Sequence, residues 1–295
     1  MILCATLIWG IGIVALRAGM EYMGPLTLTS VRFLLGGFAT FLLSRFTKGN
    51  SYSEHDEDPE HNRKRRKDML KAGLFCGLVL CLGVGTRQFA LLYTAVGRVS
   101  FIVSLFVIIV PIAGIFFGRK VTRSVWSAIA LAVFGMYFLG FDGGVRLSIG
   151  DMLAFVCAFA FAGHILLLNH FSQKCDILVL AYVQAFVTSA ITFVLALIFE
   201  EPSLSGIIDG IWYVLYAGIM TSSVAHILQV RALRITDPAV ASVLLSMEAV
   251  FATIVSWLWL QEILSTRELI GCAFLLAAVV LSKIPFKRKQ AQEKT

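Results

Sequence analysis

Polar residues within long apolar stretches are the first candidates for chemistry, because such groups are costly in a membrane. Glu248 is the only carboxylate deep within a stretch of this kind. A charge at mid-bilayer costs roughly 2.5–3.5 kcal/mol even on an insertion scale, so this carboxylate must face a cavity or a partner. Glu248 is therefore interpreted either as a group that accepts protons or binds an ammonium group, or as part of a structural ion pair with Arg32 or Arg87.

Two arginines also lie inside apolar stretches. Arg87, followed by Gln88, is near the outer end of its stretch. A guanidinium offers bidentate geometry to a carboxylate or phosphate, so Arg87 either binds an anionic group or anchors its helix at the membrane interface. Arg32 is expected on the second turn of its helix, from which its side chain can snorkel to the interface. We therefore interpret Arg32 as structural.

Three further polar residues, His164, His226 and Gln229, interrupt apolar helices. Membrane histidines usually make hydrogen bonds that support packing, but proton relays also use them, so both interpretations stay open. Trp9 either lines a cavity or fills lipid-facing space. The candidate substrate-binding or coupling residues are Glu248, Arg87, Gln88, Trp9, His164, His226, Gln229 and Arg32.

Motifs of other activities are missing from the sequence. There is no H-E-x-x-H, no intramembrane Asp pair, no Ser/His pair at motif spacing and no P-loop. The six cysteines form neither C-x-x-C nor a Cys/His zinc spacing. We expect no enzymatic activity, no metal and no cofactor. A channel or a scaffold is not excluded by motif.

Composition requires a membrane environment for these residues. Of 295 residues, 58% are hydrophobic and 15% are charged, and the mean hydropathy is +0.85. Soluble domains are nearer ~45–50% apolar and ~25% charged. Such a chain has too few charges to cover a water-soluble surface. We predict an all-α polytopic membrane protein, because open sheets cannot satisfy their edges in lipid.

A span of the bilayer core needs roughly 20 apolar residues, and this length predicts ten transmembrane helices. The first, although it begins near the amino terminus, lacks a basic region and a cleavage site, so we interpret it as a retained helix and not as a signal peptide. The predicted spans are 2–20, 26–46, 70–92, 98–118, 124–141, 149–171, 177–199, 211–231, 238–260 and 267–286.

The formal net charge of +7 is distributed unevenly over these spans. With a cytoplasmic amino terminus, nineteen Lys and Arg fall in links and tail on the cytoplasmic side and four on the other side. The positive-inside rule then places both termini in the cytoplasm, so the basic residues indicate membrane orientation and not nucleic-acid binding. We expect an integral protein of the plasma (inner) membrane, surrounded by lipid, as a monomer or homodimer.

An internal repeat relates the two halves of the chain. Residues 90–124 shifted by 142 positions fall on 232–266 without a gap. The stripe Ser100, Ser104, Val107, Pro111, Gly114 then matches a second stripe of mostly small or polar residues, Ser242, Ser246, Ala249, Thr253, Ser256. The link 119–123 carries three positive charges, whereas its equivalent 261–265 carries none and one carboxylate. An odd number of spans per repeat places such links on opposite sides of the membrane.

We therefore predict two inverted five-helix repeats, the hallmark of secondary transporters with a site near the midplane. The first covers 1–141 and includes a basic cytoplasmic loop at 47–69. The second covers 142–286, and a basic cytoplasmic tail follows at 287–295.

Several short motifs occur in a characteristic order: Trp9-Gly10, Pro25, Arg32-Phe33-Leu34, Tyr93-Thr94, Ser100 to Ser104, Val110-Pro111, Thr221-Ser222-Ser223, Gln229 and Ser246-Met247-Glu248. With these motifs the chain resembles the EamA-type ten-helix members of the drug/metabolite transporter superfamily. One departure is Glu248-Ala249, where that family usually has Glu-Pro. The resemblance implies a secondary-active exporter or exchanger of small organic metabolites, such as amino acids, working by alternating access. A nucleotide-sugar or sugar-phosphate antiporter is the alternative. Protons are the expected coupling ion, through Glu248.

Overall fold

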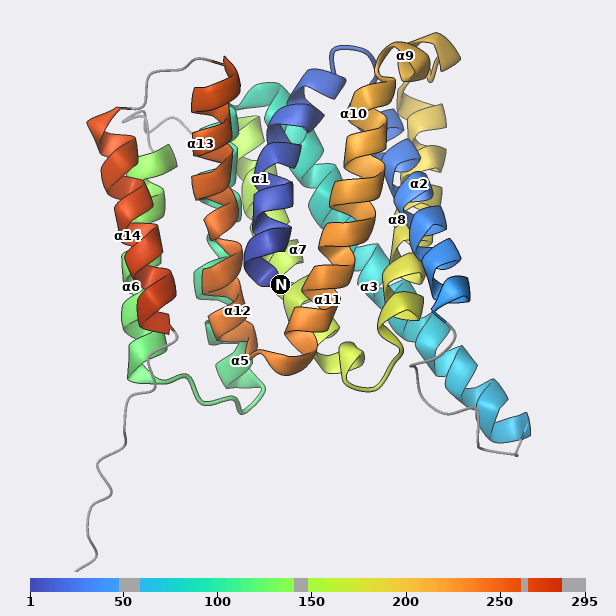
Figure 1. The fold of residues 1–295 in the computed structure, drawn as a ribbon, viewed down its shortest axis with the longest axis horizontal. Coiled ribbons are helices and arrows are strands. Elements are labelled where there is room, and N and C mark those ends of the chain that lie inside the picture. Colours follow the sequence, from blue (N-terminus) through green and yellow to red (C-terminus); the bar gives the residue numbers. More distant parts are fainter. Residues whose placement is uncertain (48–58, 141–147, 261–264, 283–295) are drawn as a thin grey trace, which may run out of the picture.

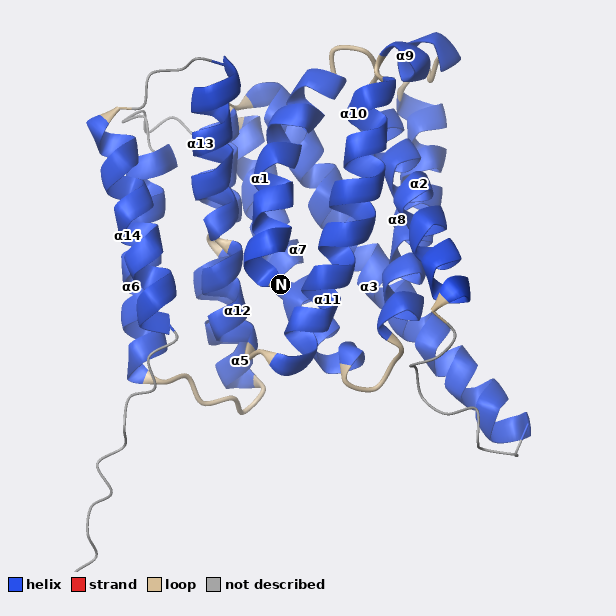
Figure 2. Cartoon of the chain, viewed as in Figure 1, coloured by secondary structure: helices blue, strands red, loops and turns tan. Residues whose placement is uncertain are grey.

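The structure, a computed structural model, describes residues 1–47, 59–140, 148–260 and 265–282. Within these ranges it consists of helices joined by short links, without any strand (Figure 2). The helices are α1 Ile2–Gly19, α2 Pro25–Phe46, α3 Pro59–Tyr93, α4 Val96–Val103, α5 Phe106–Phe116, α6 Arg123–Gly140, α7 Ile149–Ser172, α8 Ile177–Phe199, α9 Leu204–Asp209, α10 Ile211–Leu215, the π-helix η1 Tyr216–Val224, α11 Ala225–Ile235, α12 Pro238–Leu245, α13 Met247–Leu260 and α14 Thr266–Ser282.

Eight segments of the described chain are long and apolar enough to cross a membrane. Three of them join consecutive elements: α4 with α5, α10 through η1 with α11, and α12 with α13. The all-α membrane fold is thereby confirmed. The remaining two predicted spans correspond to α6, a shorter apolar helix, and α14, so crossing by all ten remains a prediction.

Local signals explain where several helices begin. Pro25 and Pro238 each occupy a first-turn position, where a missing N–H has no consequence. Ser148 and Asp151 form a reciprocal capping box at the start of α7. The Asp237 carboxylate accepts the backbone N–H of Ala239 at 2.9 Å. The breaks that the sequence places at these turns therefore have a physical cause.

Helices of the first half pack on helices of the second in matching pairs. The first half contains α1 to α6 and the second α7 to α14. Contacts of α1 with α13 correspond to those of α7 with α4 and α5, and contacts of α2 with η1 correspond to those of α8 with α3. In Figure 1, α1 and α7 run in opposite directions, and α14 lies beside α6 at one edge of the bundle. This pairing is what two inverted repeats would give, and the inverted repeat itself stays a prediction.

Glycines allow the closest of these contacts. A Cβ added to Gly135 in α6 would lie 2.8 Å from the carbonyl oxygen of Gly271 in α14, and one added to Gly271 would lie 2.7 Å from that of Gly135. A Cβ on Gly10 in α1 would lie 2.5 Å from the Cβ of Phe251 in α13. Small residues that let backbones approach are the usual means of helix packing in lipid.

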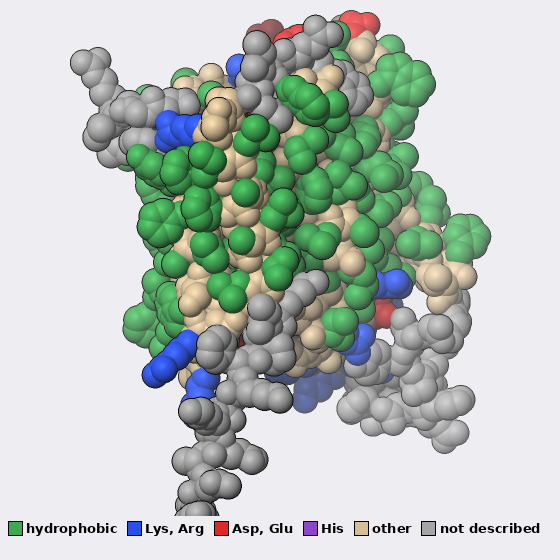
Figure 3. Space-filling view, turned by 60° about the vertical axis from the view of Figure 1, so that its left-hand side comes forward, with side chains coloured by type: hydrophobic (Ala, Val, Ile, Leu, Met, Phe, Trp, Pro, Cys, Tyr) green, Lys and Arg blue, Asp and Glu red, His purple; other side chains and the backbone are tan. Residues whose placement is uncertain are grey.

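The outer surface separates into an apolar band and charged ends. Large hydrophobic side chains such as Phe38, Phe193 and Leu197 are exposed around the bundle. Figure 3 shows this apolar band, with Lys and Arg gathered mostly at the lower end. Parts of the predicted cytoplasmic loop (48–58), the predicted tail (287–295) and the link 261–264 lie outside the described residues. Orientation in the membrane stays a prediction.

Two helix breaks follow the sequence repeat. The chain leaves α4 at Ser104 with φ −65° and ψ −7°, and leaves α12 at Ser246 with φ −64° and ψ −14°. In each case the serine N–H donates to a carbonyl four residues earlier, Ser100 or Ser242. The two serines are 142 residues apart, the offset of the repeat. The second break occurs although position 249 is alanine, where the family that the sequence resembles usually has proline.

Candidate functional site

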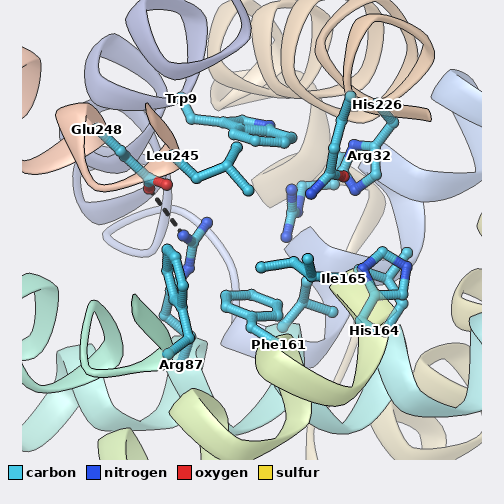
Figure 4. A pocket seen from close by; sticks show the side chains of 13 residues that line it. Trp9, Arg32, Arg87, Phe161, His164, Ile165, His226, Leu245 and Glu248 are labelled. Atoms are coloured by element: carbon cyan, nitrogen blue, oxygen red, sulfur yellow. Dashed lines mark hydrogen bonds and ion pairs between the residues drawn. The ribbon is translucent and has the colours of Figure 1, made fainter. Parts of the chain in front are cut away.

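A pocket lies inside the bundle, between the two halves of the chain (Figure 4). Its cavity volume is about 50 Å³, enough for roughly three or four waters. Seven of the eight candidate residues line it, and Gln88 does not. The lining residues are Trp9, Arg32, Leu80, Val84, Arg87, Phe106, Phe161, His164, Ile165, His226, Gln229, Leu245 and Glu248.

An ion pair joins the halves across this pocket. Nη1 of Arg87, from α3, donates to Oε1 of Glu248, from α13, at 2.9 Å. The two side chains are 9% and 20% exposed. The structure shows Glu248 both paired with Arg87 and lining the cavity, so its two interpretations are compatible. The interfacial-anchor interpretation of Arg87 is wrong, because its side chain points inward.

Arg32 also points inward, and the expected snorkelling is wrong. The residue is 2% exposed. Its guanidinium carbon lies 4.4 Å from the ring centroid of Phe33, and Nη1 donates to the hydroxyls of Thr221 at 3.5 Å and Ser222 at 3.3 Å. The reason is packing: α2 lies against η1, which brings these hydroxyls to the inner face of α2.

The π-helix η1 presents one backbone carbonyl to the pocket wall. At its end the N–H of Ala225 bonds to the oxygen of Met220, five residues earlier. The Thr221 carbonyl accepts from Nε1 of Trp9 at 3.0 Å and lies 2.8 Å from Nδ1 of His226. Because a carbonyl only accepts, Nδ1 of His226 carries a proton. Short π-helical segments inside α-helices are frequent at functional sites, and through the Thr221 carbonyl η1 fixes Trp9 and His226 relative to each other.

The remaining polar candidates differ in how well their hydrogen bonds are satisfied. Nε2 of His164 donates to Oε1 of Gln184 at 2.8 Å. Oε1 of Gln229 is buried and without a partner, although its residue lines the pocket. Both amide atoms of Gln88 are buried without a partner away from the pocket lining. Among the described residues, no cluster of His, Cys, Asp and Glu could hold a metal ion.

Comparisons with known proteins agree with this architecture. The model of the EamA-like transporter family matches residues 1–141 and 148–284. The chain belongs to the EamA-like transporter family. It is 28% identical over 93% of its length to an uncharacterized transporter of Archaeoglobus fulgidus, covering 82% of that protein. It is 21% identical over 98% of its length to the uncharacterized transporter YoaV of Bacillus subtilis, covering 97% of it. A solved structure with 19% identity shares the fold at a TM-score of 0.70, over 94% of this chain and 97% of that one.

The repeat of this EamA-like transporter extends into its pocket. Shifting Arg87 by 142 positions gives Gln229, and shifting Phe106 gives Glu248. All four side chains line the cavity. The repeat therefore relates the charged pair Arg87 and Glu248 to a second pair, Gln229 and Phe106, in which each residue is the equivalent of one member of the first pair. Sequence reasoning missed Phe106, although the offset applied to Glu248 points to it.

The apolar wall was also missed. Leu80, Val84, Phe161, Ile165 and Leu245 line the cavity of this EamA-like transporter. They carry no sequence signal, because each is an ordinary apolar residue in an apolar helix. Together they give a mainly hydrophobic pocket with a few polar groups, the usual composition of a small-molecule site.

Proposed function

We propose that this EamA-like transporter is a secondary-active exporter or exchanger of small organic metabolites, such as amino acids, that works by alternating access. The observation that carries the proposal is the pocket itself. Both halves line it, and an ion pair between Arg87 and Glu248 spans it. Inverted-repeat carriers bind substrate near the midplane between their repeats, and Trp9 and Glu248 lie near the middle of their spans.

Glu248 is the proposed coupling residue, with protons as the coupling ion. Its carboxylate faces the cavity and holds Arg87 at 2.9 Å. Adding a proton to that carboxylate would remove the charge that retains Arg87, so protonation and the separation of α3 from α13 would be linked. Ionisable residues inside membrane segments commonly mark such proton relays. The proposed location is the plasma (inner) membrane with both termini cytoplasmic, which the distribution of Lys and Arg supports.

The test measures flux in sealed vesicles. The purified chain is reconstituted in proteoliposomes, and uptake of radiolabelled amino acids is followed at several internal and external pH values. We expect flux that depends on the pH gradient in the wild type and loses that dependence in Glu248→Gln. Glu201→Gln is the matched control, because Glu201 is exposed outside the spans.

Two outcomes would contradict the proposal. Unchanged pH dependence in Glu248→Gln would remove the coupling role of that residue. Conversion of the same compounds in detergent solution, without flux in sealed vesicles, would indicate an enzyme in place of a carrier. A nucleotide-sugar or sugar-phosphate antiporter would instead show exchange of those compounds, tested with the same vesicles.

A further inference from the structure

Arg32 carries a positive charge that the described part of the chain does not neutralise. Among the residues that the structure describes, no carboxylate forms an ion pair with Arg32, and the other cation in the lining of the pocket is Arg87, a like charge. Arg87 itself is engaged by Glu248. The pocket lining therefore holds two guanidinium groups and one carboxylate. A charge buried in a membrane protein is normally paired, so one negative charge is needed to neutralise Arg32.

The hydrogen bonds of Arg32 leave one defined edge of its guanidinium unmatched. The group has five N–H donors. The two on Nη1 are directed to the Thr221 and Ser222 hydroxyls. Nε and Nη2, which carry the other three, are buried and without a partner. Nε and Nη2 form the edge that binds a carboxylate side-on.

The same chain contains this geometry in completed form. Nε of Arg98 donates to Oδ1 of Asp151 at 2.8 Å, and Nη2 donates to Oδ2 at 2.8 Å. Arg98 thus uses the two nitrogens that Arg32 leaves unmatched. The comparison indicates what kind of group completes Arg32: a planar oxyanion with two oxygens, such as a carboxylate.

The neighbours of Arg32 hold it in this orientation. The Thr221 hydroxyl donates to the carbonyl of Ala217 at 2.6 Å, so its oxygen is free to accept from Arg32. Thr221 is fixed in turn by Trp9 and His226 through its own carbonyl. The Phe33 ring lies under the guanidinium. Cation–π contact and two long hydrogen bonds give Arg32 a structural support, but they leave three of its five donors unsatisfied.

The balance of charge selects among anions. One uncompensated guanidinium is neutralised by one negative charge. A phosphate monoester carries about −1.5 to −2 at pH 7, which would leave excess negative charge in a mainly apolar pocket. The small cavity, about 50 Å³, means that the rest of any substrate enters only as the surrounding side chains or helices move apart.

We propose that Arg32 binds the carboxylate of the transported molecule through its Nε and Nη2 edge, so that the substrates are small carboxylic acids carrying at most one net negative charge, amino acids included. This assignment rests on the proposed function, since it names the substrate class of the same pocket. In the bound state the carboxylate accepts from Nε and Nη2 of Arg32.

The experiment measures binding in detergent, independently of flux. The probes are the proteinogenic amino acids and simple monocarboxylates, each paired with its neutral amide, and a set of phosphate monoesters that includes glycerol phosphate. Thermal shift identifies the carboxylate that stabilises the wild type most, and calorimetry gives its dissociation constant. We expect the matching amide and the phosphate esters to bind at least about 10-fold more weakly, because hydrogen bonds to a charged group are lost or a surplus charge is buried.

Variants of Arg32 and a matched control locate the effect. Arg32→Gln should weaken carboxylate binding by about 10- to 100-fold. Arg32→Lys keeps the charge but lacks the side-on edge, and should lose most of that affinity while its fold is retained. Arg45→Gln is the control, since Arg45 lies on the same helix, over the ring of Phe41 at 5.0 Å, and is exposed outside the pocket. It should bind as the wild type does.

The outcomes separate this inference from the proposed function. Equal carboxylate affinity in Arg32→Lys and Arg45→Gln would overturn it, as would a panel in which only phosphate esters or neutral compounds bind, or in which no carboxylate binds. Carboxylate binding that depends on Arg32, without flux in proteoliposomes, would leave the Arg32 assignment intact and remove the transport proposal. Flux of neutral compounds that is unchanged in Arg32→Lys would leave the transport proposal intact and remove the Arg32 assignment.

Discussion

Replacing Arg87 and Glu248 by leucine, singly and together, tests whether the pocket is held by charge. Removing one partner of a buried pair costs about 3–5 kcal/mol, because it leaves a lone charge. Here the contact is a single hydrogen bond at 2.9 Å, and the side chains are 9% and 20% exposed toward a cavity. We therefore expect a lower cost, about 2–3 kcal/mol for a single replacement.

The two single variants should not be equal. Glu248→Leu leaves Arg87 and Arg32 as two like charges in one pocket, whereas Arg87→Leu leaves Glu248 and Arg32, two opposite charges, in that pocket. Glu248→Leu is thus expected to lose more stability than Arg87→Leu. The double variant should lie within about 1 kcal/mol of the wild type, because an apolar pair of similar volume often replaces a buried ion pair without loss.

The assay is equilibrium unfolding in mixed detergent micelles, followed by circular dichroism, for the wild type and the three variants. The coupling energy is obtained from the double-mutant cycle. Additive losses, with a coupling below about 0.5 kcal/mol, would refute the reasoning, since independent sites add. Equal losses for the two single variants would refute the part assigned to Arg32.

Two further predictions concern the frame around the pocket. Gly10→Ala should lower the free energy of unfolding by about 1–3 kcal/mol, because the new Cβ would lie 2.5 Å from the Cβ of Phe251 in α13. Gly85→Ala should raise it by about 0.5–1 kcal/mol, because a Cβ there has nothing within 4 Å. Thermal melting in detergent measures both variants, and shifts of the same sign would contradict the packing argument. Glu200→Gln should cost about 1–2 kcal/mol, because this carboxylate accepts two backbone N–H groups at the start of α2 at 2.7 and 2.8 Å. The same assay on the exposed neighbour, Glu201→Gln, should show no change, and equal losses would argue against a cap.

Hydropathy located the helices well but not their full extent. The predicted span 70–92 corresponds to α3, which begins at Pro59. The difference arises because residues 59–69 are helical but too polar to lie in the bilayer. A hydropathy criterion, which finds only apolar segments, therefore leaves them out. The span 98–118 is divided at Ser104, which no proline or glycine announces. Such breaks depend on packing against a second helix, which a local pattern does not contain.

Polarity within apolar helices identified the six polar and charged residues that line the pocket, because burial of such groups requires a cavity or a partner. Polarity did not predict whether each of these side chains points into the pocket or away from it. Arg32 has the sequence position of a snorkelling residue, and only the packing of α2 on η1 turns it inward. Gln88 has the same polarity as Gln229, but it lies outside the pocket lining. The side of a helix that meets a partner is a property of tertiary packing.

The inverted repeat and the charges of the pocket together bear on the mechanism. If two equivalent halves exchange their conformations, a contact between two residues is lost and a contact between their repeat equivalents forms in its place. Here Arg87 with Glu248 would be exchanged for Gln229 with Phe106, which cannot form an ion pair. Separating the first pair thus leaves two charges without compensation. On the proposed mechanism, a proton on Glu248 or a carboxylate at the arginines lowers that cost. An empty, unprotonated carrier would then be held in one state, and this retention is the condition for coupled transport.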